Sequence, residues 1–251
     1  MINSGRVVQL IIFVTFAAYY YYAMRAFIAT GRFSMRPLRA VQTMEEAVGR
    51  ATEMGRPIHW TFGAGTMNGQ IFAGFNLLGY TARLCAKYET RLLVSIRLPE
   101  IVPMCEEIVR RAYVDEGRPD AFRPEDLRFW GTSHNPAMIG LIAREKPAGN
   151  FIIGNLFHES VLALEAGALV GAIQVGGTMN THQLPFIAAG SDAIFIGAEM
   201  FAASAHISRN PVMVGTVMAE ELIKKTSVVL MVIGILAATA GNTDLVTLLQ
   251  R

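Results

Sequence analysis

Residues 57–70 read Pro-Ile-His-Trp-Thr-Phe-Gly-Ala-Gly-Thr-Met-Asn-Gly-Gln. An apolar run with β-favouring side chains ends in Gly63, Gly65 and Gly69, and a helical pattern follows at once. This order predicts a strand, a tight turn and a helix, which is how α/β domains place backbone N–H groups and a helix N-terminus near an anion. The spacing G-x-G-x-x-x-G departs from the dinucleotide-binding G-x-G-x-x-G, so glycines needed only for the turn and for close packing are the competing interpretation.

On both sides of this stretch, short apolar runs alternate with longer helical patterns. We expect strands at residues 58–62, 90–98, 127–130, 151–153, 172–175, 187–189 and 193–196. We expect helices at residues 43–54, 70–88, 100–114, 135–145 and 159–169. Thr43 and Glu46 form a capping-box pattern at the start of the first of these helices. The alternation predicts an α/β fold with a Rossmann-like, mostly parallel sheet and helices on both faces.

The tetrapeptide Gly65-Thr-Met-Asn68 recurs as Gly177-Thr-Met-Asn180, and each copy follows an expected strand. Two equivalent turns would share the carboxyl edge of a parallel sheet, where open α/β sheets bind ligands. An ancient duplication and a chance match of four residues both explain the repeat. If the edge binds a ligand, the contacts are expected from nine residues of the two turns: Gly63, Gly65, Thr66, Asn68, Gly69, Gly176, Gly177, Thr178 and Asn180.

Val7 to Met24 is an apolar run of 18 residues without a charged side chain, close to the minimum for a transmembrane helix. Tyr19 to Tyr22 lie at one end of it, where aromatic rings favour the membrane interface. A signal peptide is the alternative, but bulky tyrosines and Arg25 follow rather than a small-residue cleavage site. Arg6 alone precedes the run, whereas four arginines follow it within residues 25–39, so the positive-inside rule places the following domain in the cytoplasm.

The C-terminal part of the chain predicts one long helix that begins at Asn210-Pro211. Residues 220–225 carry two Glu–Lys pairs at i,i+4, and residues 228–240 are apolar and uncharged. We therefore expect the second half of the helix to enter the membrane, with a buried core helix as the alternative. The predicted organisation is an N-terminal transmembrane anchor at 1–30, a cytoplasmic α/β domain at 31–210 and a long C-terminal helix at 211–251.

Composition and motifs exclude several classes of function. Charged residues make up only 17% of the chain, which favours membrane contact, and a formal net charge of +2 does not favour nucleic-acid binding. Cys85 and Cys105 lie far apart and are expected to be reduced. None of the five histidines shows an H-x-x-x-H or H-E-x-x-H spacing, so no metal site is expected. The sequence also lacks the G-x-S-x-G elbow of many hydrolases.

The anchor, GAGTMNG at 63–69, HNPAMIG at 134–140, the segment 174–205 and the C-terminal apolar helix together resemble an uncharacterised prokaryotic membrane-protein family. The resemblance covers nearly the whole chain. It implies a Rossmann-like α/β domain between two hydrophobic helices, and it transfers no activity.

Two functions from different classes are compatible with these features. The first is a structural or assembly component of a homo-oligomeric or multi-subunit complex in the inner (cytoplasmic) membrane, whose glycine turns bind a nucleotide or another small anion. The second is a nucleotide-dependent membrane-bound enzyme, with oxidoreductase chemistry as the leading candidate. Its weakness is that the sequence offers no set of base, nucleophile or metal ligands. We favour the first, with the lipid bilayer and copies of the chain or other membrane subunits as partners.

Overall fold

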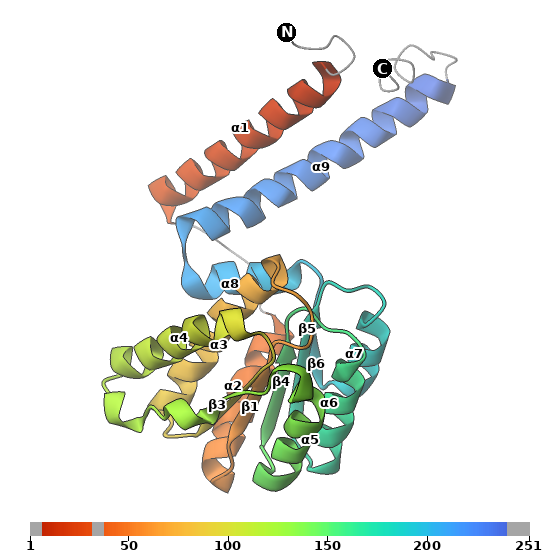
Figure 1. Ribbon diagram of the computed structural model, residues 1–251. Helices are drawn as coiled ribbons and strands as arrows, with labels where there is room; N and C mark the ends of the chain where they lie inside the picture. Colours follow the sequence, from red (N-terminus) through yellow and green to blue (C-terminus); the bar gives the residue numbers. More distant parts are fainter. Residues whose placement is uncertain (1–6, 32–37, 240–251) are drawn as a thin grey trace. The chain divides into compact units, whose positions relative to one another are not determined.

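The computed structural model of the protein describes residues 7–31 and 38–239 (Figure 1). The chain divides into two compact units, residues 36–208 and residues 1–35 with 209–251, which are described separately. Arg6, Arg32 and Arg36, which contribute to the predicted orientation, lie outside the described residues, as does Ala240 at the end of the second apolar segment.

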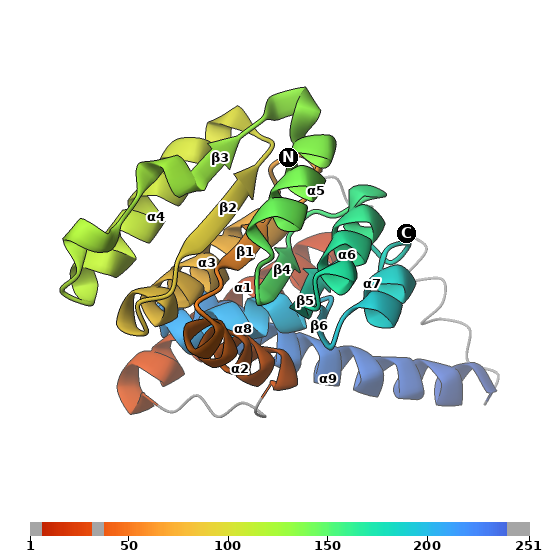
Figure 2. The same cartoon turned by 90° about the horizontal axis from the view of Figure 1, so that it is seen from below.

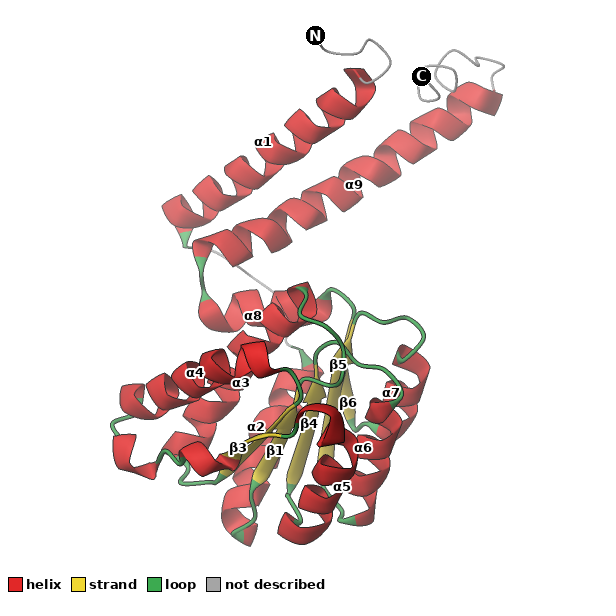
Figure 3. Cartoon of the chain, viewed as in Figure 1, coloured by secondary structure: helices red, strands yellow, loops and turns green. Residues whose placement is uncertain are grey.

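Unit 36–208 is built on a six-stranded sheet in the order β3-β2-β1-β4-β5-β6 (Figure 3). The strands are β1 (Ile58–Thr61), β2 (Leu92–Ile96), β3 (Leu127–Phe129), β4 (Gly149–Ile153), β5 (Ile173–Thr178) and β6 (Ala193–Ile196). Every neighbouring pair is parallel, which confirms the predicted α/β fold with a mostly parallel sheet. The chain order reverses between β1 and β4, and open α/β sheets bind ligands outside the carboxyl ends of the strands at such a point.

Helices cover both faces of this sheet (Figure 2). One face carries α2 (Arg39–Met54), α3 (Gly69–Lys87), α4 (Val102–Asp115) and α8 (Glu199–Ser208). The other face carries α5 (His134–Glu145), α6 (Glu159–Leu169) and α7 (Leu184–Gly190). The larger core lies on the first face, where Trp60 packs edge-on against Phe62 and Phe151. This double covering explains why the central strands are buried along their whole length.

Two sequence predictions in this unit are wrong. The first helix does not begin at Thr43, because α2 begins at Arg39 and Leu38 contributes no side-chain cap. Burial of Ala40 with the rest of the helix's apolar face extends it beyond the capping-box signal. Residues 187–189 form no strand, since they lie within α7, and periodicity cannot assign such a short apolar run.

In the described residues of unit 1–35 with 209–251, the helices α1 (Val7–Thr30) and α9 (Pro211–Thr239) pack against each other. A Cβ atom on Gly215 would lie 3.0 Å from Met24 Cβ and 3.1 Å from its Cα, so the two backbones approach closely there. The Tyr19 and Thr226 hydroxyls are 3.1 Å apart. Asn210 caps α9 by accepting from the N–H of Val212 at 2.9 Å, as predicted.

Length and composition qualify one helix of the described residues as a candidate membrane span, α1 from Gln9 to Thr30. A signal sequence near the N-terminus would meet the same criterion. The described part of α9 does not meet it, so the second predicted transmembrane segment is not confirmed. Its Glu220–Lys224 and Glu221–Lys225 pairs are present, with N–O distances of 2.7 and 4.0 Å.

Candidate functional site at the carboxyl edge

The two Gly-Thr-Met-Asn turns are linked at the carboxyl edge of the sheet. Asn155, which follows β4, donates from Nδ2 to the carbonyl of Thr66 at 2.9 Å and accepts at Oδ1 from Asn180 Nδ2 at 3.1 Å. Gln70 Oε1 accepts from the Thr178 hydroxyl at 3.0 Å and from the N–H of Met179 at 2.7 Å. The structure therefore brings together the two turns that the sequence predicts at one edge, with Asn155 and Gln70 as the connecting side chains.

The glycines of the first turn lie against protein atoms. Gly63 has φ +81°, and a Cβ there would lie 2.5 Å from Leu156 Cδ2. A Cβ on Gly65 would lie 2.3 Å from the Asn155 side chain and 2.6 Å from its carbonyl oxygen, to which Gly65 donates its N–H at 2.9 Å. Gly69 differs, because a Cβ there would meet only the ring of Phe201 at 3.5 Å. Close packing alone thus requires Gly63 and Gly65.

The glycines of the second turn also lie against other protein atoms. A Cβ on Gly176 would lie 2.2 Å from Ile187 Cγ2, and one on Gly177 would lie 3.2 Å from both Met200 Sδ and Phe195. Both residues belong to β5 and are buried.

The polar residues of the turns are largely engaged within the protein. Asn68 caps α3 by accepting from the N–H groups of Gln70 and Ile71 at 3.0 and 3.4 Å. The Thr178 hydroxyl also accepts from the N–H of Asn180 at 3.2 Å, and Asn180 donates from Nδ2 to the carbonyl of Leu156 at 2.6 Å. Thr66 is exposed and contributes its carbonyl oxygen. These side chains fix the shape of the edge.

The buried carboxylate of Glu159 occupies the position where the first turn would hold an anion. Glu159 is 1% exposed at the start of α6, and its Oε1 accepts from the N–H groups of Ala64 at 2.7 Å and Phe157 at 2.9 Å. The N-terminus of α6 favours a negative charge there. Arg97 Nη1 donates to the carbonyl of Ala64, which holds the turn from its other side. A phosphate on this turn would meet a like charge.

This role of Glu159 does not follow from the sequence pattern alone, although an acidic residue at the first position of the expected helix 159–169 is the available signal. Its second oxygen, Oε2, is buried and has no hydrogen-bond partner within the part of the chain that the structure describes.

His134 opens α5 at the same edge and is 1% exposed. Its Nε2 lies 3.4 Å from the Thr61 hydroxyl at the end of β1. Burial lowers the pKa of His134, and hydrogen bonds that His134 donates to the Asn135 side chain and the Ser95 backbone oppose this only in part. The neutral imidazole and the Glu159 carboxylate are acid–base groups, but both are buried beneath the edge and closed to a substrate in this structure.

A row of polar side chains crosses four strands of the sheet, near the amino ends of β1, β4 and β5. His59 Nδ1 and Asn150 Oδ1 are 2.7 Å apart, and Asn150 Nδ2 donates to Gln174 Oε1 at 2.9 Å. Because Asn150 Nδ2 also donates to the Ala163 carbonyl, Oδ1 is the acceptor and His59 Nδ1 carries the proton. His59 Nε2 then accepts from the Ser95 hydroxyl at 2.7 Å. With a neutral His59 imidazole, each side chain of the row donates to the next, from Ser95 through His59 and Asn150 to Gln174.

Two cavities of unit 36–208 lie away from the glycine turns. One of about 230 Å³ is at the amino ends of β2 and β3, and one of about 270 Å³ lies between α3, α4 and the end of α8. Cys85 and Cys105 are free and buried, as predicted. Within the described residues, no group of three or more His, Cys, Asp or Glu side chains is placed to hold a metal ion.

Comparison with known proteins extends this picture only at the level of family. No curated protein and no solved structure matches the sequence significantly. The profile of one family, described as Domain of unknown function (DUF6754), matches residues 1–249. The match covers almost the entire chain and agrees with the expected resemblance to an uncharacterised family. The chain therefore belongs to the DUF6754 family.

Proposed function

We propose that the protein is a membrane-anchored assembly component of a homo-oligomeric or multi-subunit membrane complex. The observation that carries this proposal is an apolar rim around the carboxyl edge. The rim consists of six large side chains that are 37–55% exposed: Met67, Phe72, Phe157, Met179, Phe186 and Ile196. Met67, Phe157 and Met179 follow the carboxyl ends of β1, β4 and β5. Phe72 and Phe186 lie in the first turns of α3 and α7, and Ile196 ends β6. Exposed large apolar side chains that gather at one edge of a sheet are typical of interaction surfaces.

The repeated turns support this function because the side chains of Asn68, Thr178 and Asn180 form hydrogen bonds within the protein. Asn68 and Asn180 stabilise the backbone, whereas Met67 and Met179 occupy the same position in the two tetrapeptides and are 37% and 43% exposed. Methionine is a flexible and polarizable side chain that adapts to apolar partner surfaces. The repeat is thus explained as a device that presents two methionines at one protein interface.

The membrane part of the proposal rests on α1 and α9. Along α1, the side chains of Leu10, Ile11, Phe13 and Val14 are 44–71% exposed, which is costly in water and favourable in lipid. Residues 228–233 of α9 are likewise apolar and 50–63% exposed. We propose that residues 1–30 anchor the chain, that residues 211–251 enter the same membrane, and that residues 31–210 face the cytoplasm.

The orientation predicts the labelling of a cysteine placed at Thr132, an exposed residue just before α5. A Thr132→Cys variant should react with a membrane-impermeant maleimide only after the cytoplasmic membrane has been permeabilised. The parent protein is the matched control, because its own cysteines are buried. Reaction in intact cells would reverse the proposed orientation.

Native mass spectrometry in mild detergent tests the assembly role, because it reports subunit number and retained small molecules together. We expect an oligomer or a larger complex for the parent protein. Met67→Glu with Met179→Glu should weaken association by roughly 100-fold or more, since each buried methionine contributes about 1.5–3 kcal/mol. Leu169→Glu is the matched control, because Leu169 is 79% exposed but lies at the end of α6, on the opposite edge. A monomeric parent protein, or equal effects of both changes, would contradict the proposal.

A nucleotide-dependent oxidoreductase is the second candidate, and the strand order favours it. The order β3-β2-β1-β4-β5-β6 is that of Rossmann-like dinucleotide-binding domains, with a glycine turn after β1. The Glu159 carboxylate on the Ala64 N–H opposes it, because it occupies the site of a pyrophosphate. The same mass spectra separate the two functions, since a retained nucleotide or dinucleotide would add its mass to each subunit.

A further inference from the structure

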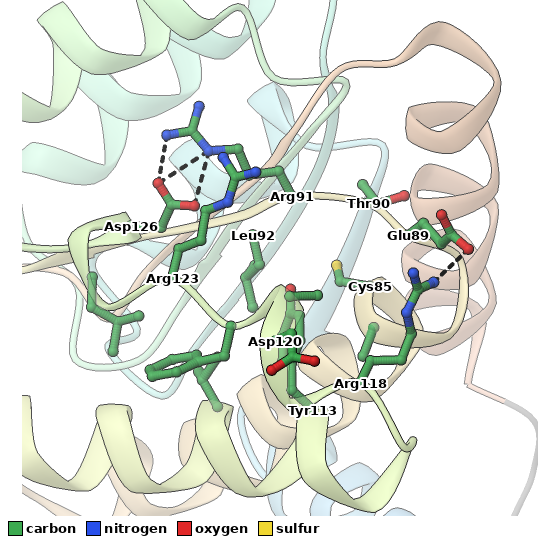
Figure 4. A pocket seen from close by; sticks show the side chains of 15 residues that line it. Cys85, Glu89, Thr90, Arg91, Leu92, Tyr113, Arg118, Asp120, Arg123 and Asp126 are labelled. Carbon is green, nitrogen blue, oxygen red and sulfur yellow. Dashed lines mark hydrogen bonds and ion pairs between the residues drawn. The ribbon is translucent and has the colours of Figure 1, made fainter.

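The cavity of about 230 Å³ lies at the amino ends of β2 and β3, on the opposite edge from the glycine turns. We name it the amino-edge cavity. It is enclosed by the end of α3, the start of β2, the end of α4 and the segment 118–127 (Figure 4). It shares no residue with the candidate site or with the apolar rim, so the inference below does not rest on the proposed function.

The inner part of the amino-edge cavity is apolar with one polar group. Leu92, Val109 and Phe122 line it beside Tyr113, whose ring meets Phe122 edge-on at a centroid distance of 6.2 Å. Tyr113 is only 5% exposed, and its hydroxyl has no hydrogen-bond partner among the described residues. Burial raises the pKa of Tyr113, with further contributions from Cys85 and Asp126, so the hydroxyl stays a donor at neutral pH. A hydroxyl without a protein partner beside apolar walls is the arrangement of a small-molecule site.

Three arginines line the outer part of the cavity, and they differ in how their guanidinium groups are paired. The Arg91 guanidinium is held in ion pairs, because its Nε donates to both carboxylate oxygens of buried Asp126 at 2.9 and 3.0 Å and its Nη1 donates to Glu145 at 3.0 Å. Arg118 pairs with Glu89, which is 70% exposed, and such surface pairs are weak. Arg123 makes no ion pair with any described residue.

The charges around the cavity are unevenly placed. Like Arg123, Asp120 is a charged lining residue without an ion pair in the described part of the chain. Figure 4 shows Asp120 on the opposite side of the cavity from Arg123. At the Arg123 end, Arg91 is paired with both Asp126 and Glu145, whereas the Arg123 guanidinium has no ion-pair partner among the described residues. That end therefore offers one unpaired planar guanidinium, which suits a carboxylate or phosphate.

We propose that the amino-edge cavity binds a small organic anion with an apolar body. Its anionic group pairs with Arg123, its apolar body lies against Leu92, Val109 and Phe122, and an acceptor atom receives the Tyr113 hydroxyl. Arg91 and Asp126 hold the wall in place, and Arg118 can leave its surface pair with Glu89 to contact the ligand.

The test measures the thermal unfolding midpoint of the full-length protein in detergent as probe anions are added. Benzoate, 3-phenylpropionate and phenyl phosphate combine an anion with an apolar body. Benzyl alcohol lacks the anion, whereas acetate and inorganic phosphate lack the body. We expect a saturable rise of the midpoint with at least one aromatic anion and little or none with the three incomplete probes. Whichever of the carboxylate and phosphate probes raises the unfolding midpoint at the lower concentration identifies the anionic group of the ligand.

Variants locate the binding. Arg123→Gln should weaken the apparent Kd by roughly tenfold or more, the usual loss for a charge-assisted hydrogen bond. Tyr113→Phe removes only the hydroxyl and should weaken binding several-fold. Arg110→Gln on the exposed face of α4 is the matched control and should leave binding unchanged. Arg123 is exposed, so its variant folds normally and decides the question even if Tyr113→Phe is unstable. The proposal is overturned if no aromatic anion stabilises the protein, or if Arg123→Gln binds as tightly as the parent.

Discussion

Gly65→Ala is expected to destabilise the protein by about 3 kcal/mol, whereas Gly69→Ala in the same turn leaves its stability unchanged or slightly higher. A Cβ on Gly65 would lie 2.6 Å from the carbonyl oxygen of Asn155, and backbone cannot move away as a flexible side-chain tip can. Forcing such an atom into a packed site costs at the upper end of the usual 1–3 kcal/mol. A Cβ on Gly69 has ordinary contact with Phe201 at 3.5 Å, and alanine is the better helix former.

The thermal unfolding midpoint of each variant, followed through tryptophan fluorescence to which buried Trp60 contributes, checks this pair. For a unit of this size, a loss of 3 kcal/mol lowers the midpoint by about 6–12 °C. An unchanged midpoint for Gly65→Ala would show that the turn is looser than the structure describes. Normal stability with loss of a retained small molecule would instead show that Gly65 faces a ligand.

The glycine turn illustrates how far sequence alone reaches. The pattern of residues 57–70 predicts strand, turn and helix, and β1 and α3 begin within one residue of the predicted positions. It cannot tell what the glycines approach, because Asn155 and Glu159 come from a segment about 90 residues later. A glycine required by a ligand and one required by a distant loop have the same sequence signature.

Helix boundaries show the same division between local and distant causes. The predicted range 159–169 coincides with α6, where a short loop and Gly171 give local signals. The first helix was predicted to begin at Thr43, although α2 begins at Arg39, because burial of its apolar face decides the outcome. Local capping is worth about 1 kcal/mol, which is less than burial of one large apolar side chain.

The polar row across the sheet could not be predicted from the sequence. It consists of polar residues within four mostly buried strands: His59, Ser95, Asn150 and Gln174. Only the strand register places His59 beside Asn150 and Asn150 beside Gln174. Strand order and register depend on packing across the sheet, so the sequence shows four isolated polar residues and not their connection.

Because His59 belongs to this row, the free energy of unfolding is expected to depend on pH. His59 is expected to contribute about 3 kcal/mol to the change between neutral and acidic pH. Burial lowers the pKa of His59 to about 4, the Asn150 hydrogen bond partly opposes this, and His134 adds to the lowering. In the unfolded chain the imidazole titrates near 6.5. Between these values the unfolded state binds the proton and the folded state does not. Stability is therefore fully present above about pH 6.5 and falls as the pH drops toward 4.

The unfolding midpoint measured from pH 7.5 to pH 4 in the parent and in His59→Asn tests this contribution. The asparagine amide can still donate to Asn150 Oδ1 but takes up no proton in this range. The variant should be less stable than the parent at pH 7.5, because the hydroxyl of Ser95 loses its acceptor, yet it should lose less stability on acidification. His182→Asn, at an exposed loop position, controls for removal of a histidine as such. Since the pKa of His134 is also lowered, the double variant with His134→Asn should have the flattest profile. Parallel pH profiles for the parent and His59→Asn would mean that His59 takes up its proton in the folded protein at the same pH as in the unfolded chain, and the protonated Nε2 would then donate to the Ser95 hydroxyl instead of accepting from it.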